Sequence, residues 1–186
     1  TGRHDRAKGT SAGNANDNPV SGVTIIPAVD KDGLTVTASG LTDESGKATV
    51  TLSGTKTAVS DITVSVATAG STAVNADKKV SFIAGLPSQS TSVITTDTTT
   101  YIAGSTMTVT ATLKDESGNG VSGQADLLTS TTVQVPNAVQ AGKWADNGDG
   151  TYTAAYTAQT AGTGLKATLK LAGWSRNSES AAYDIA

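Results

Sequence analysis

Apolar and hydroxyl side chains alternate along several stretches of the chain with a period of two. Ala48, Val50 and Leu52 alternate with Thr49 and Thr51, and the same alternation runs through residues 62–66 and 106–113. This period places one kind of side chain on each face of an extended strand. We therefore expect strands of about five to eight residues between Ser-Gly, Asn-Gly and Asp-Gly turns, a spacing that is typical of antiparallel β-sandwiches.

The same order of signals occurs twice, about 100 residues apart. The first copy runs from a Gly13-Asn14 loop through residues 19–22, 43–52 and 61–67. The second copy runs through residues 118–123, 146–156 and 166–172. Two tandem units of one fold explain this repetition better than a single domain does. The predicted fold class is therefore all-β, with two tandem sandwiches.

A short connection is predicted between the two units. The last strand of the first unit is expected over residues 80–84, and Gly85, Leu86, Pro87 and Ser88 follow it. Pro87 has no N–H to donate, so a sheet ends there. We place the domains at residues 1–84 and 85–186. Because the connection is only four residues long, we expect the units to lie end to end with restricted bending.

The N-terminal segment departs from the pattern, because residues 1–10 show no apolar alternation. One interpretation is an irregular, truncated or disordered chain end. The other is a strand that pairs through its backbone alone. In either case the first unit is expected to lack an edge of the sandwich, and with it some N-terminal strands, and to be the less stable of the two.

Composition and charge exclude several classes of function. The chain has 186 residues, no cysteine, one histidine (His4), a net charge of −3 and a pI near 5.0. Without cysteine there is no disulfide, thiolate zinc site or thiol nucleophile. The acidic balance removes the attraction on which non-specific binding to nucleic acids and anionic membranes depends. We expect a soluble piece of a longer protein, with no signal peptide and no membrane-inserted segment.

Two motifs carry a resemblance to a known family. Residues 114–123 read Lys-Asp-Glu-Ser-Gly-Asn-Gly-Val-Ser-Gly, and residues 43–52 read Asp-Glu-Ser-Gly-Lys-Ala-Thr-Val-Thr-Leu. Over residues 11–186 the chain resembles the bacterial immunoglobulin-like (Ig-like) domains of the invasin and intimin adhesins. The second unit has Asn147 to Tyr152 in place of Gly-Lys-Ala-Thr, a form that filamin-like Ig units share.

The resemblance implies two Ig-like β-sandwiches from the passenger of an inverse autotransporter, displayed on a Gram-negative cell surface and anchored in the outer membrane. It implies a structural spacer or stalk that projects an adhesive tip and whose partners are the neighbouring Ig-like domains of the same chain. We expect a monomer that binds no cofactor. Two alternatives stay open: a module that itself binds a host glycoprotein or matrix protein, and an Ig-like decoration of a phage or secreted bacterial protein.

Residues 146–150 form the densest cluster of carboxylates and glycines, Asp-Asn-Gly-Asp-Gly. An EF-hand calcium loop needs an oxygen ligand at its third position and a bidentate Glu at its twelfth, where this chain has Gly148 and Thr157. Asn-Gly and Asp-Gly are also the preferred dipeptides of tight hairpins. We favour a turn, with a cation site as the alternative.

The aromatic residues are few and have alternative roles. Tyr152 and Tyr156 share one face of a predicted strand, and Tyr152 stands where sandwiches place a corner tyrosine whose hydroxyl bonds the backbone. Trp144 and Trp174 are either packed at the rim of a core or exposed as anchors for a partner. We favour the structural role for both pairs.

No catalytic, cofactor or metal residue is predicted. The Thr-rich run 95–100 suggests an ice- or glycan-binding array, but we favour a solvated strand and loop because the run occurs once. Ser–His–Asp chemistry would need His4, in a segment without a predicted strand. We therefore expect no enzyme. The residues that matter are those that fix geometry, namely Gly46, Gly118, Gly123, Gly150 and Pro87.

Overall fold

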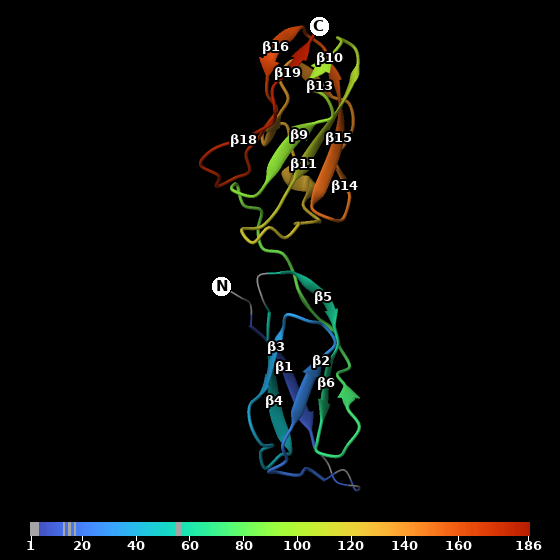
Figure 1. Cartoon of the computed structure of the whole chain (residues 1–186), viewed down its shortest axis with the longest axis vertical. Coiled ribbons are helices and arrows are strands. Elements are labelled where there is room, and N and C mark those ends of the chain that lie inside the picture. Colours follow the sequence, from blue (N-terminus) through green and yellow to red (C-terminus); the bar gives the residue numbers. More distant parts are fainter. Residues whose placement is uncertain (1–3, 13, 15, 17, 55–56) are drawn as a thin grey trace. The chain divides into compact units, whose positions relative to one another are not determined.

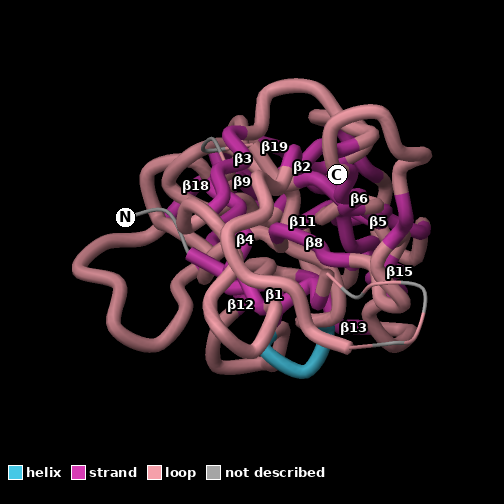
Figure 2. Tube along the Cα trace, turned by 90° about the horizontal axis from the view of Figure 1, so that it is seen from below, coloured by secondary structure: helices cyan, strands magenta, loops and turns pink. Residues whose placement is uncertain are grey.

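A computed structural model describes residues 4–12, 14, 16, 18–54 and 57–186, with only the backbone described for residues 4–11. The chain divides into two compact units, Thr1–Ile83 and Ala84–Ala186. Both are built from strands (Figure 1), so the predicted all-β class is confirmed. In the described part of the chain the one helical segment is a single 3-10 turn, η1 (Ala125–Leu127), drawn in cyan in Figure 2.

The described residues of the first unit form three small sheets. Their strand orders are β1-β4-β3, β2-β6-β7 and β5-β8. The strands are β1 (His4–Ser11), β2 (Ile26–Val29), β3 (Thr35–Ala38), β4 (Lys47–Ser53), β5 (Val59–Ile62), β6 (Val64–Ala67), β7 (Val74–Asn75) and β8 (Val80–Phe82).

The N-terminal segment forms a strand. β1 pairs antiparallel with β4 from His4 opposite Ser53 to Ser11 opposite Lys47, with a shift in register between Ala7 and Thr10. The expectation of an irregular or disordered end is therefore wrong for residues 4–11, and the alternative of a strand paired through its backbone is confirmed. Backbone pairing needs no apolar alternation, which is why the side-chain pattern did not reveal it. Gly13 of the predicted loop lies outside the described residues.

One predicted strand of the first unit is divided between two sheets. The alternation predicts one strand over residues 62–66, but β5 ends at Ile62 and pairs with β8, whereas β6 begins at Val64 and pairs with β2. Asp61 has a φ of 56°, a left-handed conformation that turns the chain. The Thr63 N–H donates to Asp30 Oδ1 at 2.7 Å. The irregularity at Asp61 thus interrupts the pairing along one hairpin, in which β5 and β6 run opposite β8 and β7 in nearly the same register.

The core of the first unit lies between its sheets. Buried and exposed positions alternate along β4, where Ala48, Val50 and Leu52 point inward. They pack with Ile62 and Val64 from the divided strand, and with Ile25 and Phe82. The sequence periodicity of β4 therefore corresponds to its burial, as predicted.

The second unit has more strands. Its largest sheet has the order β13-β15-β11-β9, with β14 also on β15, and the others are β12-β17-β18 and β10-β19-β16. The strands are β9 (Val93–Thr96), β10 (Thr100–Tyr101), β11 (Thr106–Thr112), β12 (Val133–Gln134), β13 (Ala138–Gln140), β14 (Ala145–Asp146), β15 (Thr151–Ala158), β16 (Gly162–Leu165), β17 (Thr168–Leu169), β18 (Ser178–Glu179) and β19 (Tyr183–Ile185).

The central pair of the second unit, β11 and β15, is antiparallel from Thr106 opposite Thr157 to Thr112 opposite Thr151. Alternate residues of both strands are buried, and Met107, Val109 and Tyr152 have no exposed surface. In the first unit β1 pairs with β4 much as β11 pairs with β15. However, β11 carries β9 on its other edge, whereas among the described residues β1 pairs with β4 alone.

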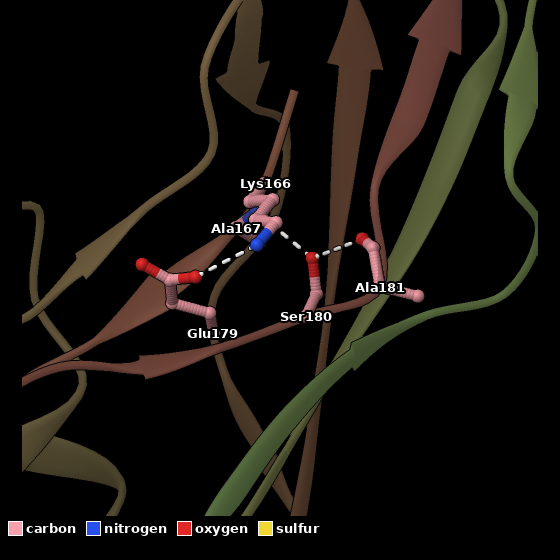
Figure 3. A network of polar contacts seen from close by, with 5 residues as sticks. All are labelled: Lys166, Ala167, Glu179, Ser180 and Ala181. Carbon is pink, nitrogen blue, oxygen red and sulfur yellow. Dashed lines mark hydrogen bonds and ion pairs between the residues drawn. The ribbon is translucent and has the colours of Figure 1, made fainter. Parts of the chain in front are cut away.

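The second unit also has a strand whose pairing is interrupted. β16 pairs with β19, and β17, which begins two residues after β16 ends, pairs with β12 and β18. Figure 3 shows the contacts at this interruption of the pairing: the buried Ser180 hydroxyl accepts the Ala167 N–H at 2.9 Å and donates to the Ala181 carbonyl at 2.7 Å. Beside it, Lys166 pairs with Glu179 at 3.0 Å with both side chains half exposed, so the pair contributes at most about 1 kcal/mol.

Among the described residues, no helix has the length and apolar character needed to cross a membrane.

Candidate functional site

The cluster at residues 146–150 is a tight turn, as predicted, and it connects β14 to β15. Asp146 Oδ1 accepts the Gly148 N–H at 2.8 Å, and its Oδ2 accepts the Gly123 N–H at 2.5 Å. Asp149 Oδ1 accepts both the hydroxyl of Thr151 at 2.6 Å and its N–H at 2.9 Å, and these bonds hold the pKa of Asp149 below its ordinary value. Both carboxylates therefore bind N–H groups of the protein itself.

The corresponding turn of the first unit is built in a similar way. Asp43 Oδ1 accepts the N–H groups of Ser45 and Lys47 at 2.8 and 2.9 Å. Gly46 has a φ of 71°, and a Cβ there would lie 2.7 Å from the Ala12 carbonyl oxygen. Each unit therefore closes this turn against the loop that follows its first long strand.

Gly150 takes the place of Gly46 in the second unit. Its φ is 90°, and a Cβ there would lie 2.6 Å from Gly120 Cα and 2.8 Å from the Leu113 carbonyl oxygen. Only glycine fits both the backbone conformation and the space. Gly118 and Gly123 also have a positive φ but face open space, and Pro87 lies between β8 and β9, outside any strand.

Tyr152 bridges the segment 121–124 in the second unit, which confirms the predicted corner tyrosine. Its buried hydroxyl donates to the Val121 carbonyl at 2.6 Å and accepts the Gln124 N–H at 3.0 Å. Burial raises the pKa of Tyr152, so the hydroxyl stays protonated and able to donate. The bond joins β15 to a loop 31 residues away in sequence.

Thr42 makes the same bridge in the first unit, a role that no pattern in the sequence predicts. Its hydroxyl donates to the Val20 carbonyl at 2.7 Å and accepts the Val23 N–H at 3.0 Å. Residues 20–23 read Val-Ser-Gly-Val and residues 121–124 read Val-Ser-Gly-Gln. Tyr152 stands two residues after Gly150, whereas the residue two positions after Gly46 is Ala48, which has no hydroxyl. In the first unit the hydroxyl of Thr42, which precedes the turn, makes these bonds instead.

The two tryptophans pack against the core of the second unit, as favoured. Trp144 is 9% exposed and meets Tyr156 edge to face, with ring centroids 6.3 Å apart. Its indole N–H is buried and has no hydrogen-bond partner among the described residues. Trp174 is partly buried against the same cluster.

The Thr-rich run 95–100 spans β9, a turn and β10, as favoured, and Asp97 in the turn accepts the Tyr101 hydroxyl at 2.6 Å and the Thr108 N–H at 2.9 Å. A regular array of threonines lies instead on β11 and β15, where none is predicted above. The outward positions of β11 and β15 carry no charge and face one another in register; they are Thr106, Thr108, Thr110, Thr112, Thr151, Thr153, Ala155 and Thr157. The alternation in residues 106–112 was the available signal.

The remaining candidates do not form a cluster. The backbone of His4 lies in β1, and its side chain is outside the described part of the chain. Among the described residues, no group of three or more His, Cys, Asp or Glu side chains could hold a metal ion. The expectations of no catalytic residue and of no cation at residues 146–150 stay predictions.

Comparison with protein families gives one match for each unit. The model of the bacterial Ig-like domain (group 1) matches residues 10–83, and that of invasin domain 3 matches residues 87–185. The second match covers more than half of the chain.

Individual relatives are adhesins. The inverse autotransporter adhesin YeeJ of Escherichia coli K12 is 34% identical over 119 residues, which are 62% of this chain and 5% of YeeJ. The solved structure of the Escherichia coli adhesin FdeC has a TM-score of 0.64 at 23% identity, covering 90% of this chain and 55% of that one. The structure of invasin, a bacterial integrin-binding protein, has a TM-score of 0.45 at 20% identity, over 98% of this chain and 39% of that one.

Proposed function

Since this chain belongs to the family of bacterial Ig-like domains that includes domain 3 of invasin, we propose that it is a stalk segment of a bacterial surface adhesin, where it carries an adhesive tip away from the cell. The family match confirms the resemblance that the repeated motifs indicated. The chain spans only 5% of YeeJ, so the adhesive role of the whole protein enters this proposal by analogy.

The observation that carries the proposal is the separate core of each unit. Among the described side chains, the first unit buries a cluster around Leu52 and Ile62, and the second a cluster around Met107 and Tyr152. A stalk needs modules that fold without help from a ligand and that add length when joined in series. The non-enzymatic role, the extracellular location at the bacterial surface and the monomeric state belong to the same proposal.

The polar side chains at the turns support the same role. The carboxylates of Asp43, Asp146 and Asp149 and the hydroxyls of Thr42 and Tyr152 bind backbone groups of the protein itself. A group that satisfies its own loop is preorganised for shape rather than for a ligand. We therefore assign the geometry of the stalk to these turns, with Gly46 and Gly150 at their closest approaches.

An exchange experiment tests the stalk. In the full-length adhesin, residues 1–186 are replaced by an unrelated tandem pair of Ig-like domains of similar length, and adhesion of the cells is measured. A stalk predicts unchanged adhesion, and the isolated chain should bind host cells no better than the unrelated pair. Loss of adhesion after the exchange, or saturable binding of the isolated chain to a purified host receptor, would overturn the stalk role.

One feature favours the second candidate, a module that binds a host glycoprotein or matrix protein. The uncharged outer face of β11 and β15 presents threonine hydroxyls and methyl groups in register. Such a face hydrogen-bonds a partner without a cost of charge desolvation. Thr108→Lys places a charge at its centre on an exposed position, with Ser130→Lys, at an exposed hydroxyl residue outside these strands, as a control of equal charge change. The stalk predicts that neither substitution alters adhesion, whereas a binding face predicts a loss with Thr108→Lys alone.

A further inference from the structure

Asp115 stands in the turn that follows β11 and is 8% exposed. Its Oδ1 accepts the N–H groups of Ser117 and Asn119, each at 2.9 Å, and its own N–H donates to the Asn119 carbonyl at 3.0 Å. One carboxylate oxygen is therefore sufficient to close this turn.

The first unit contains the same turn with an amide in place of the carboxylate. Asn14 Oδ1 accepts the N–H groups of Asn16 and Asn18 at 2.9 and 3.2 Å, and the Asn14 N–H donates to the Asn18 carbonyl at 3.0 Å. The turn itself therefore needs no negative charge and no second acceptor.

The second oxygen of Asp115 has another use. Its Oδ2 accepts the Gly85 N–H at 2.9 Å and the side-chain N–H of Asn119 at 2.9 Å. An asparagine would present an NH2 group at this place and leave Gly85 without an acceptor. Burial pushes the pKa of Asp115 upward, but the bonds from Asn119, Gly85 and Ser117 outweigh it and hold the pKa below its ordinary value.

The residues after Gly85 lie along the same turn. The Ser88 N–H donates to the Lys114 carbonyl at 2.7 Å, and the Thr91 hydroxyl donates to the Asp115 carbonyl at 2.8 Å. Ser92 Oγ accepts the Lys114 N–H at 3.0 Å. The segment 84–92 is thus bonded to residues 114–115 at several points, and the Asp115 carboxylate makes the bond nearest to its start.

We propose that Asp115 is a clamp whose second carboxylate oxygen fixes the start of the connecting segment, residues 84–88, to the turn of the second unit. An acidic residue stands at this position because its second oxygen accepts the N–H of Gly85, which precedes it in the chain. This inference deepens the proposed stalk function and rests on it for its biological meaning, because a stalk with fixed joints transmits position better than one with loose joints.

Amide hydrogen exchange resolved by residue tests the clamp in the whole chain. Asp115→Asn keeps an acceptor for Ser117 and Asn119, as Asn14 shows, and removes the acceptor of Gly85. We expect the Gly85 amide to exchange about tenfold faster or more, with Ser117 and Asn119 still protected. Glu116→Gln, which removes an exposed charge from the next residue, and Asn14→Asp in the first unit should leave Gly85 unchanged.

Unchanged protection of Gly85 in Asp115→Asn would overturn the clamp. If that variant fails to fold, as the fluorescence of Trp144 and Trp174 would show, the native chain still decides. An unprotected Gly85 amide in the native chain refutes the clamp, and a protected one supports it. Neither result depends on adhesion, so failure of the clamp and failure of the stalk are distinguishable.

Discussion

At the scale of single residues, buried hydroxyls have a large role in this protein. Tyr152 and Thr42 each satisfy a carbonyl and an N–H of the same four-residue segment in their respective units. A buried backbone group without a partner costs more free energy than a typical hydrogen bond contributes. The stability of each unit should therefore respond to the loss of one oxygen atom.

We expect Tyr152→Phe to lower the free energy of unfolding of the second unit by about 1–3 kcal/mol, because two backbone groups lose their partner while the ring stays packed. The measurement is denaturant unfolding followed by tryptophan fluorescence. Tyr156→Phe is the control, since in the described part of the chain its hydroxyl makes no hydrogen bond and its ring packs on Trp144. Equal losses for both variants would contradict the bridging role.

Tyr183 makes the second unit sensitive to alkali. Burial, and then the neighbouring Tyr101, raise the pKa of Tyr183 from 10.0 to about 12. Above pH 10 the unfolded chain loses this proton while the folded chain keeps it, so the stability is complete below pH 10 and falls as the pH rises toward 12. Tyrosinate absorbance should therefore appear together with unfolding. All four tyrosines lie in the second unit, and ionisation of Tyr183 in a folded chain at pH 10 would contradict this.

At the scale of elements, the turns and the strand β1 set the limits of each sandwich. We expect Gly150→Ala to destabilise the second unit by more than about 3 kcal/mol, since the new methyl group meets both a positive φ and the backbone of Gly120 and Leu113. Gly148→Ala is a matched control, because its φ of 83° is similar but its Cβ would face open space. Its loss should be about 1–2 kcal/mol. The measurement is the denaturant midpoint of each variant.

Deletion of residues 1–11 tests β1. The deletion removes a strand paired with β4 from Lys47 to Ser53, and it leaves that edge of β4 without a partner. We expect the first unit to melt at a lower temperature, by several degrees, and the tryptophan transition of the second unit to stay unchanged. Calorimetry measures the melting of the first unit, and tryptophan fluorescence measures the transition of the second. An unchanged thermogram would mean that β1 adds nothing to the fold in solution.

At the scale of the whole molecule, the two units should unfold separately. Among the described side chains the buried apolar cluster of the first unit has 7 members and that of the second has 20, so the first should unfold at lower temperature or denaturant concentration. Both tryptophans belong to the second unit, so their fluorescence follows that unit alone, whereas circular dichroism follows both. A single coincident transition would show that the units fold as one body.

Much of this protein could be predicted from its sequence, because the relevant physics is local. The alternation around Val50 and Val109 fixed the strands and their buried faces, and the glycines before Lys47 and Thr151 marked the turns. The place of Tyr152 just after its turn was enough to predict the corner bond. In these cases a side chain and its role lie within a few residues of each other.

The tertiary structure decided what depends on partners far away in the sequence. β1 has no side-chain signal and forms because β4, some forty residues later, offers a backbone edge. Thr42 takes the role of a tyrosine because the fold brings Val20 and Val23 next to its hydroxyl. Asp115 uses its second carboxylate oxygen because the fold places the Gly85 N–H within hydrogen-bond distance of it. Hydrogen bonds are satisfied in space rather than along the chain, so only the folded arrangement shows which group meets which.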